Sequence, residues 1–154
     1  MWFKNLQLYR FTQPIELTIE SLSEQLAEHS FKPCGSQELS RAGWVSPLGR
    51  HSEELVHASS GYFMVCSKRQ DKILPSSVVN DFLEEQVHEI ESTESRKISR
   101  KERSSIKEEV IFSLMPKAFS RSSLQFAYIS LRDNLLVINA SSEKRAEELI
   151  QNLR

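Results

Sequence analysis

The sequence predicts an α+β fold in which a mainly antiparallel sheet is packed with helices and carries a projecting antiparallel helical hairpin. Three observations predict this fold. Short apolar runs occur in pairs that are joined by turn residues, as in β-hairpins. Two Ser-x-x-Glu capping boxes precede apolar residues at helical spacing. The chain has 154 residues, which is long enough for one domain with a real core.

The first elements along the chain are a strand and a helix. Residues 2–11 are rich in aromatic and apolar side chains, so we expect a strand in the centre of the sheet that ends before Pro14. A capping box at Ser21–Glu24 predicts a helix of about 10 residues that ends near His29. Pro47 and Gly49 then interrupt the pattern, so any strand there is short.

A β-hairpin follows at residues 55–68. Ser59, Ser60 and Gly61 separate its two apolar runs, as turn residues do. The second run, residues 62–66, is nearly all apolar. Such a composition is typical of a strand that is covered on both faces.

Two helices come next. Val79, Leu83 and Val87 lie on an amphipathic helix that begins near Ser76. A capping box at residues 99–102 starts a second helix with apolar residues every four positions. Two helices joined by a short polar turn form an antiparallel hairpin. We expect residues 75–116 to form this hairpin as a finger on a sheet body made of residues 1–74 and 117–154.

A second β-hairpin and a final helix complete the predicted order, β-α-β-β-αα-β-β-α. Asp133 and Asn134 form the turn between a strand with Phe126 and Tyr128 and a strand over residues 135–139. Ser141 or Ser142 then caps the last helix, whose apolar positions are Ala146, Leu149, Ile150 and Leu153.

Charge is distributed unevenly although the net charge is only −1. Residues 81–94 contain no Lys or Arg and six acids, namely Asp81, Glu84, Glu85, Glu89, Glu91 and Glu94. Residues 96–107 contain one acid and six bases, namely Arg96, Lys97, Arg100, Lys101, Arg103 and Lys107. The small net charge therefore hides a strong local dipole.

The basic block has two interpretations. Arg96, Arg100, Arg103 and Lys107 share one face if the segment is helical, and a face without interleaved acids suits a polyphosphate. Alternatively, the acidic helix neutralises these bases and the hairpin is a solvated, self-complementary surface. No aromatic residue lies among the bases, which argues against a stacking platform for single strands.

Enzyme motifs are absent from the sequence, so we expect no enzyme, no metal site and no cofactor. Ser104 with Lys107, and Ser141 with Lys144, match the Ser-x-x-Lys spacing of some acyl enzymes but lack its companion motifs. Four residues of the first hairpin region are candidate metal ligands or, more simply, surface polar residues: His51, Glu53, Glu54 and His57.

Phe119 and the cysteines complete the candidates. Phe119 stands between Lys117 and Arg121 after Pro116, so it is either an exposed interface anchor or a core residue at the junction of helix and strand. Cys34 and Cys66 lie far apart without a CxxC motif, which favours reduced thiols in a cytosolic protein. No apolar run is long enough to span a bilayer, and the start of the chain lacks the features of a signal peptide.

Five blocks of the sequence together resemble RdgC, a family of bacterial recombination-associated proteins. The blocks are the opening MWFKNL, the segment F-x-PCGSQ at 31–37, GWV-x-P-x-G-x-HS at 43–52, KILPS at 72–76 and L-x-P-x-AFSR at 114–121. The chain resembles only the N-terminal half of the family, so we expect the family's C-terminal base domain to be absent. The chain is then either an excised fragment or a truncated natural product.

The resemblance implies a protein that is not an enzyme. It implies a ring-shaped homodimer that encircles double-stranded DNA without sequence preference in the cytoplasm, is associated with the nucleoid, and restrains recombination by the RecA recombinase indirectly. The hairpin at 75–116 matches the family's tip, and Phe119 matches an aromatic of the dimer contact. The cations expected to bind DNA are Arg96, Lys97, Arg100, Lys101, Arg103, Lys107, Lys117 and Arg121. The alternative is that this half is mainly an oligomerisation module and that DNA is held by the other half.

Overall fold

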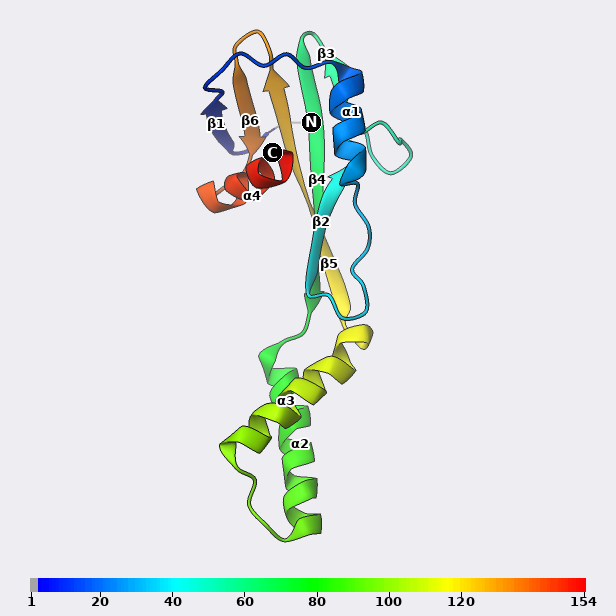
Figure 1. The fold of residues 1–154 in the computed structure, drawn as a ribbon, viewed down its shortest axis with the longest axis vertical. Coiled ribbons are helices and arrows are strands. Elements are labelled where there is room, and N and C mark those ends of the chain that lie inside the picture. The colour runs from blue at the N-terminus through cyan, green and yellow to red at the C-terminus, as the bar shows by residue number, and fades with distance from the viewer. Residues whose placement is uncertain (1–2) are drawn as a thin grey trace. The chain divides into compact units, whose positions relative to one another are not determined.

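The computed structural model describes residues 3–154 and divides the chain into two compact units. The first, which we call the sheet unit, contains the residues up to Lys32 together with Arg41–Arg69 and Ser122–Arg154. The second, which we call the helical unit, contains Pro33–Ser40 and Gln70–Arg121. Figure 1 follows the chain through both. The helical unit includes all of residues 75–116, and the projection of this segment as a finger stays a prediction.

Six strands form one sheet. They are β1 (Leu6–Arg10), β2 (Ser40–Val45), β3 (His57–Ser59), β4 (Tyr62–Ile73), β5 (Phe119–Ser130) and β6 (Leu135–Asn139). The order across the sheet is β1-β6-β5-β4-β2, and β3 pairs with β4. The β1–β6, β3–β4 and β5–β6 pairs are all antiparallel. Both predicted hairpins and the α+β class are therefore confirmed.

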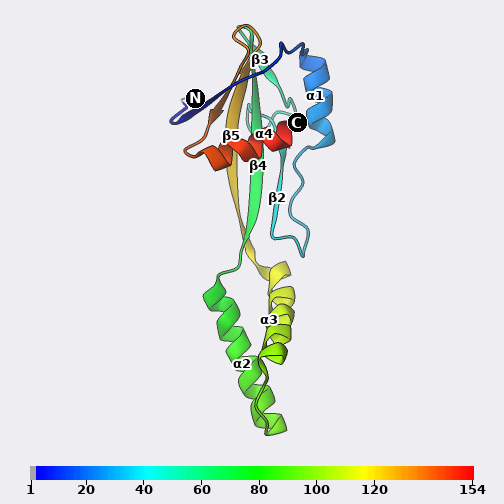
Figure 2. The same cartoon turned by 60° about the vertical axis from the view of Figure 1, so that its left-hand side comes forward.

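The core of the sheet unit lies between one face of the sheet and two helices, α1 (Ile19–Glu28) and α4 (Glu143–Leu153). Leu22 and Leu26 of α1 and Leu149 of α4 are almost fully buried in it. They pack with apolar side chains from β4, β5 and β6. Both helices lie against the same face of the sheet (Figure 2).

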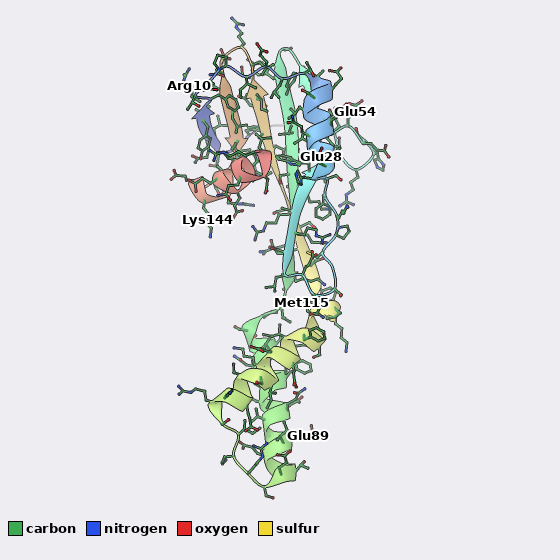
Figure 3. The ribbon with its side chains drawn as sticks, in the orientation of Figure 1. Arg10, Glu28, Glu54, Glu89, Met115 and Lys144 are labelled. Atoms are coloured by element: carbon green, nitrogen blue, oxygen red, sulfur yellow. The ribbon has the colours of Figure 1, made fainter. Side chains whose placement is uncertain are left out.

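The helical unit is built around α2 (Ser76–Glu94) and α3 (Arg100–Leu114), which are followed by a 3₁₀ turn over Met115–Lys117. The predicted apolar stripes pack against each other through Val79, Leu83, Val87, Ile106 and Val110. The capping box predicted at Ser99 is present, since Ser99 accepts from the N–H of Glu102 and Glu102 accepts from the N–H of Ser99. Figure 3 labels Glu89 on α2 and Met115 beyond the end of α3.

The expectation of a central first strand is wrong. β1 is the edge strand beside β6, and it covers only Leu6–Arg10. Leu6 and Leu8 are 53% and 62% exposed, whereas a central strand would bury both faces. Within residues 3–11, Tyr9 and Phe11 pack against the core on one face of the sheet, while Leu6 and Leu8 lie on the opposite, more open face. Residue 2 lies outside the described residues.

Two further details differ from the sequence interpretation. Thr18, not Ser21, caps α1, and Ser21 completes a capping box from its third position, so the helix begins at Ile19. β2, which contains Trp44 and ends at Val45, is an additional strand that the predicted order of elements omitted. Its pattern is weak because it carries Arg41 and Gly43, which are not typical strand residues.

Candidate nucleic-acid interface

The eight cations predicted to bind DNA all lie in the helical unit. Arg96 and Lys97 are in the loop between α2 and α3, and four others are on α3. Lys117 ends the 3₁₀ turn, and Arg121 lies on β5. The sequence spacing placed Arg96 on one helix face with Arg100 if the whole segment was helical. In the structure Ser95 adopts a left-handed conformation (φ 51°) and ends α2, so Arg96 lies in the loop and does not share the α3 face with Arg100.

Arg96 is engaged by two carboxylates. Its Nη1 and Nη2 donate to Oε2 and Oε1 of Glu102 at 2.9 and 2.8 Å, and its Nε donates to Glu94 at 2.5 Å. This two-point geometry is the strong form of an Arg–carboxylate pair. The hydrogen bonds from Arg96, with that from the Ser99 N–H, lower the pKa of Glu102 to about 2. The hydrogen bonds to Glu102 and Glu94 in turn raise the pKa of Arg96 above its usual range.

Two more cations of the block have acidic partners. Arg103 donates to Glu84 of α2, which joins the two helices. Lys97 lies 3.5 Å from Glu91, whose carboxylate also accepts from the N–H of Ile98. The Ile98 hydrogen bond, with the charge of Lys97, lowers the pKa of Glu91. For Arg96, Lys97 and Arg103 the interpretation as a self-complementary hairpin therefore holds, because each of these bases lies next to an acid of α2 or of the first turn of α3.

Five predicted cations have no ion pair or hydrogen-bonding partner for their side chains within residues 3–154. All five are exposed: Arg100, Lys101, Lys107, Lys117 and Arg121. We call these the unpaired cations. Arg100 and Lys107 are seven positions apart on α3 and share a face, while Lys101 points about 100° away from Arg100.

The net charge of the helical unit and the pairing of its cations decide which residues can attract phosphate. The helical unit contains nine Lys and Arg and eleven Asp and Glu, so its total charge does not attract phosphate. Attraction has to come from cations that no carboxylate neutralises. Among the candidate residues these are the unpaired cations, which are free to replace the counterions of a polyphosphate.

Phe119 is 84% exposed, so the interpretation as a core residue is wrong. The segment around it is fixed by contacts of its neighbours. Gln70 donates to the Ser120 hydroxyl at 3.1 Å, and Lys72 Nζ donates to the carbonyl of Met115 at 3.1 Å. A held, exposed aromatic ring is typical of an interface anchor. Phe112 on α3 is also exposed, at 66%, because it lies two positions from Val110 and therefore outside the apolar stripe that packs against α2.

The other candidate sites do not assemble. In the part of the chain that the structure describes, no group of three or more His, Cys, Asp or Glu could hold a metal ion. Ser142, not Ser141, caps α4 through its hydroxyl. Cys34 and Cys66 are both free thiols, and burial raises the pKa of Cys66 to about 11.

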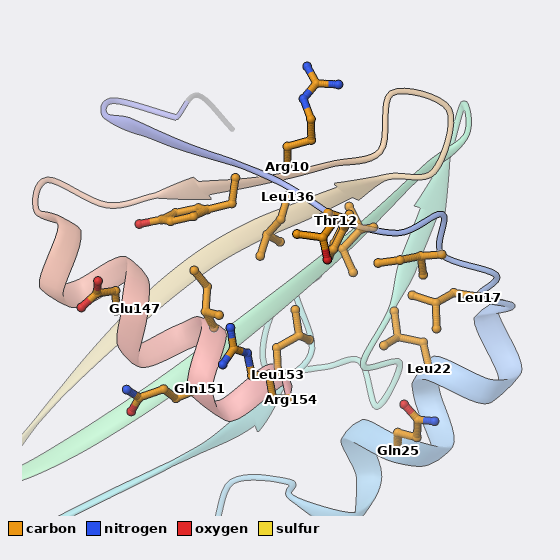
Figure 4. A pocket seen from close by; sticks show the side chains of 15 residues that line it. Arg10, Thr12, Leu17, Leu22, Gln25, Leu136, Glu147, Gln151, Leu153 and Arg154 are labelled. Carbon is orange, nitrogen blue, oxygen red and sulfur yellow. The ribbon is translucent and has the colours of Figure 1, made fainter.

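A hollow of about 720 Å³ lies in the sheet unit between the sheet, α1 and α4 (Figure 4). Apolar side chains such as Tyr9, Leu17, Leu22 and Leu153 form much of its wall. None of the predicted DNA-binding cations lines it. No helix in residues 3–154 has the length and apolar character needed to cross a membrane.

Comparison with known proteins identifies the family. The family model described as "Putative exonuclease, RdgC" matches residues 1–154. Proteins named "Recombination-associated protein RdgC" are 48% identical in Tolumonas auensis and in Aeromonas hydrophila and 40% identical in Yersinia pestis, over all 154 residues of this chain. The chain spans about half the length of these relatives, 51% of each. These matches show that the chain belongs to the RdgC family.

Proposed function

We propose that this chain takes part in binding duplex DNA without sequence preference, as part of a ring-shaped homodimer that encircles DNA in the nucleoid and restrains RecA-dependent recombination. The observation that carries the proposal is the set of unpaired cations on the helical unit. Membership of a family whose curated members are named recombination-associated supports it. The proposed role includes no catalytic step.

Lack of sequence preference follows from the chemistry of the unpaired cations. Lys ammonium groups and exposed Arg side chains neutralise phosphate charge wherever the backbone presents it. Sequence readout needs side chains held against base edges in a groove. α3 offers no Asn or Gln for such contacts, and its Ile106 and Val110 are buried against α2.

A direct test compares two duplexes of equal length and unrelated sequence by fluorescence anisotropy at one salt concentration. We expect dissociation constants that agree within about twofold, since phosphate contacts carry no sequence information. A preference of a hundredfold for one duplex would contradict the proposal. The same mixtures are incubated with Mg²⁺ and with Mn²⁺ to test the nuclease named in the family description. The DNA should keep its length, and shortening would contradict the non-enzymatic role.

A second candidate function is that this region is chiefly an oligomerisation module. The observation in its favour is the exposed ring of Phe119 on a segment held by its neighbours. Sedimentation and DNA binding measured on one sample separate the two functions. A dimer that does not bind DNA at low salt would favour the oligomerisation module. DNA binding that persists in a monomer would favour DNA binding through the unpaired cations.

A further inference from the structure

The two faces of the sheet differ in what covers them. Opposite residues of an antiparallel pair share a face, and the register places Leu8, Val137 and Tyr128 in one row. The neighbouring row of Tyr9, Leu136 and Ile129 belongs to the core under α1 and α4. Arg10 lies two positions from Leu8 and therefore on the same face as Leu8. Figure 4 shows its side chain pointing away from α4, while Leu136 points toward α4. We call the face with Leu8 and Tyr128 the second face.

The second face is apolar and partly open. Leu8 is 62% exposed and Tyr62 is 42% exposed. Tyr128 contacts Phe3 and Tyr62, each with ring centroids 5.5 Å apart. A hollow of about 370 Å³ beside these rings is lined by Tyr62, Met64 and Tyr128 together with polar residues of β3 and of the turn that follows it. Within residues 3–154, neither helix of the sheet unit packs on this face.

The sequences of β4 and β6 call for a second cover. Residues 62–66 and 135–138 are continuous apolar runs, which are typical of strands buried on both faces. Phe63 and Val65 of β4 fill the core under the helices. Tyr62 and Met64, which alternate with them, face the other side. An antiparallel sheet that had evolved to show this side to water would alternate apolar and polar residues instead.

We propose that the second face is a docking surface for the polypeptide that the longer RdgC relatives carry in addition to the region matched here. The relatives are about twice as long as this chain, so the additional sequence is ample for a further layer. Two layers packed on opposite faces of one sheet bury both faces, as the strand composition requires. This inference does not depend on the proposed binding of DNA.

Carbene footprinting with mass spectrometry tests the proposal without any variant. It compares this chain with the full-length Tolumonas auensis relative, in which the alignment covers every residue of the chain. We expect labelling at the positions of Leu8, Tyr62 and Met64 to fall at least about fivefold in the longer protein. Leu48, which is 50% exposed in the sheet unit away from these strands, serves as the unchanged control.

Two results would overturn the proposal. One is equal labelling of the second face in both proteins. The other is protection in this chain alone that grows with its concentration, because a second copy would then be the occupant.

A charge on the second face provides an independent test. Leu8→Asp should barely change the melting temperature of this chain, since Leu8 is largely exposed in it. The same change at the aligned position of the full-length relative should lower the melting temperature by at least about 5 °C, because it buries an unpaired charge. Leu48→Asp should be mild in both proteins. Equal effects of Leu8→Asp in the short and long proteins would contradict a docked layer.

Discussion

Arg96 holds Glu102 through two hydrogen bonds of 2.8 and 2.9 Å, and the same carboxylate closes the capping box of α3 at Ser99. The loop between the helices is thus tied to the first turn of α3. A negative charge at this end of a helix is also favourable for its dipole. Arg96 therefore has a structural role in the hairpin, which separates it from the unpaired cations.

Protonation of Glu102 should weaken the hairpin in acid. Its folded pKa of about 2 lies below the ordinary value of 4.5, so its contribution is complete above about pH 4.5 and disappears as the pH falls toward 2. Glu102→Gln keeps a capping-box side chain but removes the charge. We expect the variant to be less stable than the wild type at pH 7. Between pH 4.5 and 2 its stability should fall less steeply than that of the wild type. Circular dichroism melts across this range measure both, and identical pH profiles would contradict the assignment.

Phe119→Ser should weaken association while leaving the fold intact. A substitution at a side chain that is 84% exposed typically changes stability by less than about 0.5 kcal/mol. Loss of an interface anchor costs about 2 kcal/mol or more of association. Sedimentation of the full-length relative with the aligned substitution measures the second effect, and the melting temperature of this chain measures the first.

Leu83→Ala is the matched control for the Phe119 variant. Leu83 is buried between α2 and α3, so truncating it should cost about 2–5 kcal/mol of unfolding free energy. A Phe119 variant that melts as early as the Leu83 variant, while the dimer mass stays the same, would remove Phe119 from the interface.

Gly43→Ala should destabilise the sheet unit. A Cβ at this position of β2 would lie 2.4 Å from the Cα and 2.6 Å from the N of Phe31. These are backbone atoms, which a parallel bridge between Ser30 and Trp44 holds in place. We expect a loss of about 1–3 kcal/mol, and more if the bridge breaks. Thermal melting tests this, with Gly35→Ala as the control, because a Cβ there would approach only side-chain atoms of Glu38, at 3.3 Å and beyond, and no backbone atom.

The sequence was sufficient for elements whose signals are local. The capping box at Ser99, the apolar stripes of α2 and α3 and the Asp133–Asn134 turn all appear where they were predicted. The strand predicted within residues 2–11 was assigned to the centre of the sheet because an edge strand and a central strand can have the same composition. Only the strand order, which depends on distant pairing with β6, distinguishes them.

The candidate site was predictable only as a list of cations. Pairing of Arg103 with Glu84 depends on how α2 and α3 pack, since the two residues are 19 positions apart. The break at Ser95, which removes Arg96 from the helix face, depends on one left-handed residue that has no glycine to mark it. The exposure of Phe119 likewise follows from the strand that begins there. These are tertiary features, and no local pattern encodes them.

The salt dependence of duplex DNA affinity tests the central claim most directly, using Arg100→Glu with Lys101→Glu. Both residues are exposed in the first turn of α3, where acids are tolerated, so the fold should persist. Lys144→Glu with Arg145→Glu is the matched control, because this exposed pair occupies the first turn of α4 and changes the net charge equally. The five unpaired cations of one subunit contribute at most about −4.5 to the wild-type slope of log K against log salt. We predict that the α3 variant makes this slope shallower by about 2 and that the control leaves it unchanged. Equal slopes for the wild type and the α3 variant would contradict a role of the helical unit in holding DNA.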